Sequence, residues 1–218
     1  MNTALDLLRK LVRSYAHTLA RLINSVGHGT ITPNQITMVG LLMHVPIALC
    51  IAQEKLVPAA IMLTVFGLFD TLDGELARLQ HRDSAAGMVL DASTDRMKEV
   101  FLYAGIAYNL VHTGHATATV WAVLACGFSM SVSYVKAKGE TAAAKSGLTV
   151  SQVNRLFQDG LLRFEVRMGL LILGLLANQL VVVTITIAVL SAFTAFDRLA
   201  RITQSLDTGA QSTRKPHA

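Results

Sequence analysis

The chain has 218 residues, of which 52% are hydrophobic and only 15% are charged, and its formal net charge is +5. This composition is too apolar for an ordinary soluble domain of this size and predicts an integral membrane protein. The positive charge does not predict a nucleic-acid partner, because the basic residues form no soluble module with interleaved aromatic side chains. Cys50 and Cys126 both fall in apolar stretches, so no disulfide is expected.

The first 30 residues predict an amphipathic helix at the membrane surface. Arg9, Lys10 and Arg13 alternate with apolar residues that recur at helical spacing. This pattern is typical of a helix that lies in the membrane interface. A helix that packs its apolar face on the body of the protein would show the same pattern, and both readings can hold together.

Six apolar stretches follow, each near the roughly 20 residues that a spanning helix needs. They cover approximately residues 36–52, 57–79, 87–111, 118–135, 161–177 and 180–199. We therefore expect an all-α fold, namely an integral membrane six-transmembrane-helix bundle with an N-terminal amphipathic interfacial helix. The expected parts are a juxtamembrane helix (1–30), the six-helix transmembrane domain (31–205) and a flexible tail (206–218).

The lysines and arginines lie almost entirely on one side of this layout. If the N-terminus is cytoplasmic, the loops at 78–84 and 136–160 and the C-terminal tail share the cytoplasmic side, and only Lys55 lies on an opposite loop. The positive-inside rule describes this asymmetry. We therefore predict a multi-pass protein of the cell membrane with a cytoplasmic N-terminus.

Four aspartates accompany the second and third predicted spans. Asp70 and Asp73 are three residues apart, and Asp91 and Asp95 are four apart, so each pair lies on one face of its helix. The connection between the two spans is short, so the acidic faces of the resulting antiparallel hairpin can meet near its cytoplasmic end. An ionisable residue at the centre of a span costs about 2.5 to 3.5 kcal/mol on insertion scales, so four of them indicate a function.

Divalent metal ions would neutralise such a cluster. Crowded carboxylates repel each other and take up protons unless cations balance them. Oxygen ligands favour Mg²⁺ or Mn²⁺ over zinc, and four carboxylates can hold two ions about 3.5 to 4 Å apart, the arrangement that clamps a transferring phosphoryl group. Ion pairs with Arg96 or Lys98 are the alternative, which accounts for a single aspartate better than for four.

The complete pattern resembles the signature of the CDP-alcohol phosphotransferase family. It reads, without a gap, Asp70-x2-Asp73-Gly74-x2-Ala77-Arg78-x8-Gly87-x3-Asp91-x3-Asp95. The resemblance implies that the 31–205 domain is catalytic and transfers a phosphate-linked group from a CDP-alcohol to an acceptor hydroxyl, releasing CMP at the cytoplasmic side. It implies two divalent ions, Mg²⁺ or Mn²⁺, and makes Asp95 the general base. The implied metal ligands are Asp70, Asp73, Asp91 and Asp95.

The resemblance also implies a binding site for the CDP donor. From the residues alone, Gly74 and Ala77 leave room for a nucleotide, and Arg78 can donate to phosphate oxygens. Without the resemblance, Pro33 would be interpreted as the start of a helix and Ser84 as a solvated turn residue. The implied donor-binding residues are Pro33, Asn34, Gln35, Ile36, Gly74, Ala77, Arg78 and Ser84.

Basic residues at the ends of three later spans could form a pocket for a second phosphate, although topology alone also places cations there. The run Ser133-Tyr134-x-Lys136-Ala-Lys138-x-Glu140 resembles the phosphatidylinositol phosphate synthase branch of the family, which implies a CDP-linked lipid donor and a phosphorylated polyol, myo-inositol phosphate, as acceptor. The run Arg163-Phe-Glu165-Val-Arg167 departs from that branch. The implied acceptor residues are Lys136, Lys138, Arg167 and Arg198, with Arg163 and Arg155 as weaker candidates.

Two other interpretations stay open at this point. The same reaction with glycerol 3-phosphate, or with an unphosphorylated alcohol such as serine, would use the same aspartates. A membrane cation transporter also carries acids within its spans, but these usually lie near the middle of the membrane in broken helices, whereas this chain has one cluster at one end. The family resemblance further implies a homodimer.

Overall fold

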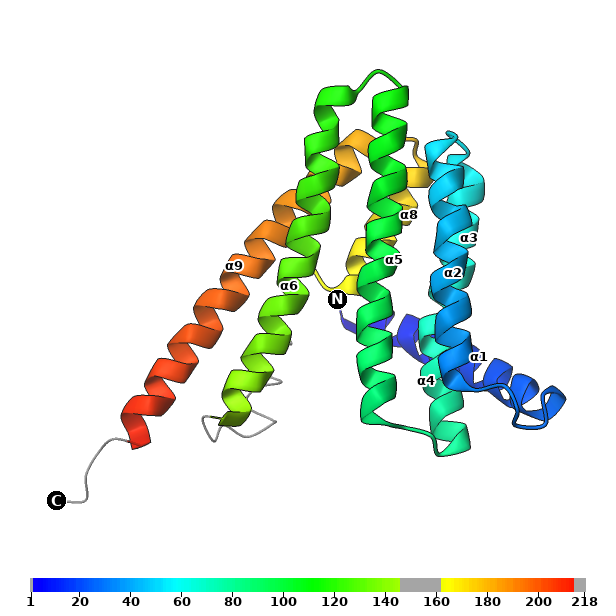
Figure 1. Ribbon diagram of the computed structural model, residues 1–218, viewed down its shortest axis with the longest axis vertical. Helices are drawn as coiled ribbons and strands as arrows, with labels where there is room; N and C mark the ends of the chain where they lie inside the picture. The colour runs from blue at the N-terminus through cyan, green and yellow to red at the C-terminus, as the bar shows by residue number, and fades with distance from the viewer. Residues whose placement is uncertain (1, 146–161, 214–218) are drawn as a thin grey trace. The chain divides into compact units, whose positions relative to one another are not determined.

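The computed structural model describes residues 2–145 and 162–213, and every regular element within them is a helix. The chain divides into two compact units, Met1–Asn109 and Leu110–Ala218. Unit 1 contains α1 (Asn2–Val26), α2 (Pro33–Ala52), α3 (Leu56–Gly67), α4 (Phe69–Gln80) and most of α5 (Ala85–His112) (Figure 1). Unit 2 contains η1 (Ala116–Ala118), α6 (Thr119–Lys145), α8 (Phe164–Leu176) and α9 (Leu180–Thr213).

Helix α2 of unit 1 begins at a complete capping box. The Gln35 backbone N–H donates to the Thr32 hydroxyl at 3.4 Å, and the Thr32 backbone N–H donates to Oε1 of Gln35 at 2.8 Å. Pro33 occupies the first turn, where its missing N–H leaves no helical hydrogen bond unmade. These contacts fix the backbone at the start of α2.

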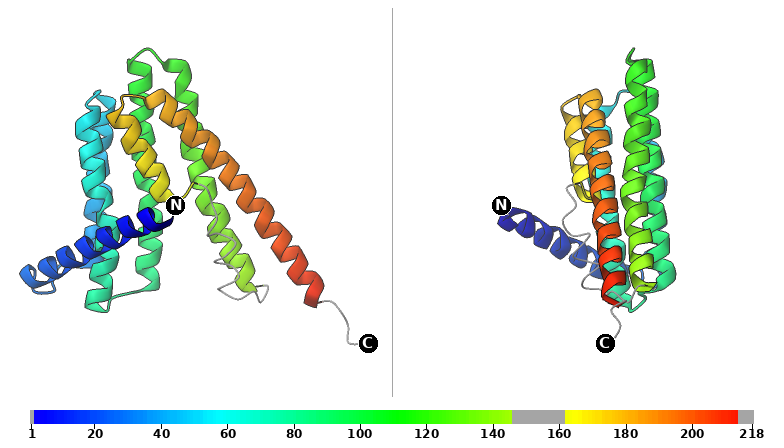
Figure 2. Two further views of the ribbon diagram at one scale, coloured as in Figure 1. Left: turned by 180° about the vertical axis from the view of Figure 1, so that it is seen from behind. Right: turned by 90° about the vertical axis from the view of Figure 1, so that its left-hand side faces the viewer.

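Helix α1 packs on the protein body through one part of its apolar face. Ala20 is fully buried in a cluster with Ile36, Leu72 and Leu76 of α2 and α4, while Tyr15 and Leu22 of α1 remain exposed. Figure 2 shows α1 running across α4 rather than along it. The structure therefore agrees with the interpretation that this helix packs on the body of the protein. Its location in the membrane interface stays a prediction.

The hairpin of α4 and α5 follows from local backbone chemistry. His81 adopts a left-handed conformation with φ 53° and ends α4. The Ser84 hydroxyl accepts a hydrogen bond from the Gly87 backbone N–H at 3.0 Å, as a cap of α5. Further along α5, a Cβ atom at Gly105 would lie 2.5 Å from the Ala48 carbonyl oxygen. The backbones of α5 and α2 are therefore in close contact at this point.

In unit 2, α6 packs along α9, and α8 and α9 form a hairpin that Figure 2 shows from behind. The Ser129 and Ser191 hydroxyls lie 3.5 Å apart in the buried contact between α6 and α9. Helix α9 continues to Thr213, into the segment for which the sequence predicts a flexible tail. Residues 214–218 and the predicted loop residues 146–161, with Arg155, lie outside the described residues.

Four helices of the described chain are long and apolar enough to cross a membrane, namely Pro33–Ala52, Leu56–Gln80, Ala116–Ala144 and Leu180–Leu206. The two other predicted spans correspond to α5 and α8. Helix α5 carries four charged residues in its first half, and α8 has 13 residues, which reach only about 20 Å. The all-helical class is confirmed for the described residues, whereas the six-span layout stays a prediction.

Candidate active site

The structure brings all four predicted aspartates together within unit 1. Asp70 and Asp73 lie one turn apart on α4, and Asp91 and Asp95 lie one turn apart on α5. The carboxylate of Asp70 interacts electrostatically with those of Asp73 and Asp95, and Asp91 interacts with Asp73 and Asp95. The α4–α5 hairpin therefore concentrates acidic charge at one place, as the residue spacing predicts.

The cluster includes a basic side chain, Lys98 of α5. The Lys98 ammonium donates to Asp70, and it lies 3.2 Å from Oδ1 of Asp95, with only 1% of its side chain exposed. Arg96 also approaches Asp95, at 3.6 Å. The ion-pair alternative therefore holds for Asp70 and Asp95, but it leaves Asp73 and Asp91 to be explained.

Those two aspartates have different surroundings. The Thr37 hydroxyl of α2 lies 2.5 Å from Oδ2 of Asp73 and donates to it. Oδ1 of Asp91 is buried and accepts no hydrogen bond from the residues that the structure describes. A buried acceptor without a partner is unfavourable, and a bound cation would satisfy it. The residues present thus fit a divalent cation in donor chemistry, with oxygen ligands only.

The side chains are not arranged as a finished coordination sphere. Among the residues that the structure describes, no three His, Cys, Asp or Glu side chains surround one point as metal ligands. The ammonium of Lys98 instead balances the charge between Asp70 and Asp95. Metal binding would therefore require these side chains to rearrange.

A pocket of about 370 Å³ opens beside the aspartates, bounded by α2, α4, the α4–α5 turn and α5. Asp73 and Asp91 both line it. Five of the predicted donor-binding residues also line it, namely Pro33, Asn34, Gly74, Ala77 and Ser84. A nucleotide in this pocket would therefore lie against the acidic cluster.

Three predicted donor-binding residues do not line this pocket. Gln35 caps α2, and Ile36 packs in the core with Leu72 and Leu76. Arg78 is held by Glu75, whose Oε1 lies 2.6 Å from the guanidinium. Arg13 of α1 lies 3.6 Å from the same oxygen. Gln35 and Ile36 thus shape the start of α2 rather than the pocket surface.

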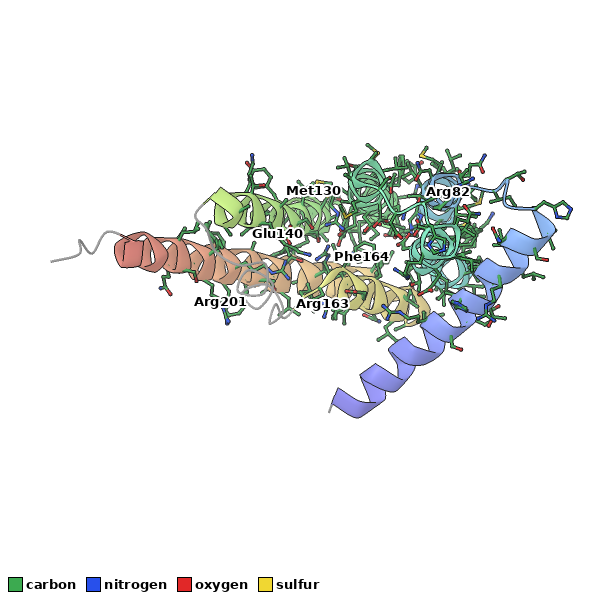
Figure 3. All side chains as sticks on the ribbon, turned by 90° about the horizontal axis from the view of Figure 1, so that it is seen from below. Arg82, Met130, Glu140, Arg163, Phe164 and Arg201 are labelled. Atoms are coloured by element: carbon green, nitrogen blue, oxygen red, sulfur yellow. The ribbon has the colours of Figure 1, made fainter. Side chains whose placement is uncertain are left out.

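Three polar residues of the pocket, Thr37, Arg82 and Asp83, are not among the predicted site residues. Thr37 lines it one turn after Pro33, and this i, i+4 spacing could have placed it on the same face of α2. Arg82, labelled in Figure 3, lines it from the turn between α4 and α5. A basic residue in a cytoplasmic loop carries no signal of its own, because topology alone explains it.

The predicted acceptor residues belong to unit 2. Arg167 of α8 is 1% exposed and Arg198 of α9 is 6% exposed, and the two guanidinium groups repel each other electrostatically. Arg163, labelled in Figure 3 at the start of α8, also repels Arg198 electrostatically. The two predicted lysines of α6 are exposed and have other neighbours, Glu140 for Lys136 and the Tyr134 ring for Lys138. Unit 2 thus places Arg167 and Arg198 close together as buried cations, for which an anion would be a favourable partner.

Relatives of known activity resemble the chain over different lengths. The phosphatidylinositol phosphate synthase of Corynebacterium glutamicum is 39% identical over 123 residues, covering 55% of this chain and 54% of that protein, so the chain spans about half the length of this relative. The archaetidylinositol phosphate synthase of Methanothermobacter thermautotrophicus is 26% identical over 208 residues, covering 92% of this chain and 98% of that protein.

Solved structures resemble the chain over most of its length. The crystal structure of Mycobacterium tuberculosis phosphatidylinositol phosphate synthase with CDP-DAG bound matches with a TM-score of 0.73 at 26% identity and covers 86% of this chain and 92% of that one. The same protein in complex with manganese and citrate matches with a TM-score of 0.74 at 26% identity, over 86% of this chain and 88% of that one.

The model of the CDP-alcohol phosphatidyltransferase family matches residues 30–196. This range is most of the chain and includes all four aspartates, the pocket at the start of α2 and the α4–α5 hairpin. The chain therefore belongs to the CDP-alcohol phosphatidyltransferase family of enzymes.

Proposed function

We propose that this enzyme transfers a phosphatidyl-type group from a CDP-linked lipid to the hydroxyl of a myo-inositol phosphate. The acceptor oxygen forms a bond to the lipid-bearing phosphorus of the donor, the bond from that phosphorus to the CMP oxygen breaks, and CMP leaves. The observation that carries the proposal is the pocket of unit 1, in which predicted donor-binding residues adjoin Asp73 and Asp91. The names of the relatives, which include two inositol phosphate synthases, support the acceptor.

In this proposal the four aspartates hold two divalent ions, Mg²⁺ or Mn²⁺, which when bound would neutralise the phosphates and polarise the attacked phosphorus. The manganese complex of the structural relative supports this assignment. Asp95 accepts the proton of the acceptor hydroxyl. Thr37 orients Asp73 through its hydrogen bond, and the capped start of α2 bounds the nucleotide pocket.

Arg167 and Arg198 bind the acceptor's own phosphate in the same proposal, with Lys136 and Lys138 as more exposed contributors. Two buried guanidinium groups that repel each other gain from a phosphate dianion, which accepts charge-assisted hydrogen bonds from both. An unphosphorylated acceptor would offer this pair no such interaction. The buried arginine pair therefore favours a phosphorylated polyol.

The enzyme acts at the cell membrane in this proposal, with six spans, an interfacial α1 and the active site facing the cytoplasm. Four apolar helices of membrane-spanning length support this location. Exposed apolar side chains on α1, including Tyr15 and Leu22, would enter the interface. A homodimer, which the family resemblance implies, completes the proposal.

The acceptor is tested by CMP release from CDP-diacylglycerol. Detergent-purified protein with Mg²⁺ would be supplied separately with myo-inositol 1-phosphate, free inositol, glycerol 3-phosphate and serine. We expect turnover with inositol phosphate and little with free inositol. Turnover with glycerol 3-phosphate or serine instead would replace the acceptor while keeping the reaction, and CMP release with none of the four would contradict the proposed function.

A further inference from the structure

Lys98 lies in a site formed by three helices of unit 1. Its ammonium contacts Asp70 of α4 and Asp95 of α5, and its side chain is almost fully buried. Gly40 of α2 lies on the third side, where a Cβ atom would be 4.0 Å from Nζ of Lys98, an ordinary van der Waals contact. One turn further along α2, Nδ1 of His44 lies 2.7 Å from the Gly40 carbonyl oxygen. Lys98 is thus enclosed between α2, α4 and α5.

The position of Lys98 has a direct electrostatic consequence for the aspartates. A buried ammonium is tolerated only when anions pair with it, and two nearby carboxylates likewise need a cation between them. In this structure the two partners of Lys98 are Asp70 and Asp95, both proposed metal ligands. Lys98 lies three residues beyond Asp95, where the family signature ends, so the signature does not account for it.

We infer that Lys98 is a resident counter-ion of the acidic cluster, a positioning residue that holds Asp70 and Asp95 together when no divalent ion is bound. The inference rests on the proposed function, because the metal ions are proposed there. A divalent ion and the ammonium compete for the same two carboxylates. Lys98 therefore weakens metal binding and, in exchange, makes folding of the cluster independent of metal.

Manganese binding to the full-length protein in detergent tests this inference directly. Free Mn²⁺ would be quantified by its electron paramagnetic resonance signal for wild type, Lys98→Met and Lys98→Arg, after removal of metals with EDTA. Methionine keeps an unbranched side chain but removes the charge, so Lys98→Met should bind Mn²⁺ at least about tenfold more tightly than wild type. Lys98→Arg keeps the charge and should bind Mn²⁺ within about threefold of wild type.

A second measurement separates competition from a purely structural ion pair. In EDTA, Lys98→Met should unfold at a lower temperature than wild type, and saturating Mn²⁺ should raise its unfolding temperature by more than it raises that of wild type. Lys55→Met, the same substitution at an exposed lysine before α3, is the matched control and should behave as wild type in both measurements. Unchanged or weaker Mn²⁺ binding by Lys98→Met would overturn the inference, as would a Lys98→Met protein that fails to fold even with Mn²⁺ present.

Asp91→Asn shows whether the metal site itself is correctly assigned. If Asp91→Asn weakens Mn²⁺ binding and Lys98→Met does not strengthen it, the counter-ion inference fails and the proposed function stands. If wild type binds no Mn²⁺, or if Asp91→Asn binds it as wild type does, the metal site fails and the inference fails with it.

Discussion

Thr37 shows how one hydroxyl outside the signature can influence the acidic cluster. It lies 2.5 Å from Oδ2 of Asp73 and 3.2 Å from the Pro33 carbonyl oxygen. The shorter contact is to a charged acceptor, and such hydrogen bonds are the stronger ones. Thr37 therefore links the start of α2 to a proposed metal ligand.

Replacing Thr37 with valine should reduce activity without unfolding the protein. Valine keeps the shape but leaves Asp73 without its donor, a loss of about 1.5 to 3 kcal/mol. We expect kcat/KM for CMP release to fall about 10- to 100-fold, with Thr37→Ser retaining most of the activity. Equal activity in Thr37→Val and wild type would show that Asp73 needs no such orientation.

Glu75 is predicted to position Arg78 for the donor phosphates. It is 6% exposed, and its carboxylate holds the Arg78 guanidinium at 2.6 Å. Glu75→Gln removes the charge from this hydrogen bond, so Arg78 should sample other orientations. The expected result in steady-state kinetics is a higher KM for CDP-diacylglycerol with a nearly unchanged kcat; a fall in kcat alone would contradict the positioning role.

The residue spacing predicted the gathering of Asp70, Asp73, Asp91 and Asp95, because helical periodicity converts i, i+3 and i, i+4 spacings into shared faces. It could not predict which cation balances each carboxylate. Lys98 is on the same face of α5 as Asp95. Lysines at this spacing commonly pair with acids on solvent-exposed helix faces, so the spacing alone did not indicate a buried contact. Burial depends on the packing of α2, and a sequence does not reveal that packing.

At the scale of elements, hydropathy located the helices better than their ends. The predicted stretch 57–79 is divided at Leu68 into α3 and α4, and α6 continues ten residues beyond its predicted end at Val135. Hydropathy reports how much of a helix is apolar, whereas polar residues such as Lys136 and Glu140 continue the helix with i, i+4 contacts of their own.

The close approach of α2 and α5 predicts a sensitive position at Gly105. A side chain there would collide with the Ala48 backbone, so Gly105→Leu should push the two helices apart. We expect this change to lower the free energy of unfolding by at least about 1 to 3 kcal/mol. We expect a lower unfolding temperature in detergent. Gly127→Leu on α6 is the control, because a Cβ at Gly127 meets none of the described residues within 4 Å. Equal unfolding temperatures for the two variants would refute the packing argument.

At the scale of the whole molecule, the proposed donor and acceptor residues belong to different units. The aspartates and the pocket proposed for the nucleotide lie in unit 1, and Arg167 and Arg198 lie in unit 2. According to the sequence, the basic ends of three later spans could come together into a pocket for a second phosphate, which in the proposed function lies beside the metal ions. That convergence involves residues of both units and stays a prediction.

This division predicts a selective kinetic defect. Arg198→Gln removes one of the two buried cations among the described residues of unit 2 and changes no residue of the pocket in unit 1. The KM for inositol phosphate should rise about tenfold or more, while the KM for CDP-diacylglycerol stays within about twofold of wild type. Equal increases in both values, with an unchanged unfolding temperature, would argue against separate donor and acceptor sites.

The central claim is that the aspartate cluster of unit 1 performs metal-dependent transfer from a CDP-linked lipid. Its most direct test is CMP release from CDP-diacylglycerol and inositol phosphate during a Mg²⁺ titration, for wild type, Asp95→Asn and Glu54→Gln. Glu54→Gln removes one carboxylate from the turn between α2 and α3, outside the site. We predict that wild type and Glu54→Gln are inactive in EDTA and activated by Mg²⁺, and that Asp95→Asn is at least about 100-fold slower at every Mg²⁺ concentration. Metal-independent CMP release, or full activity of Asp95→Asn, would contradict the claim.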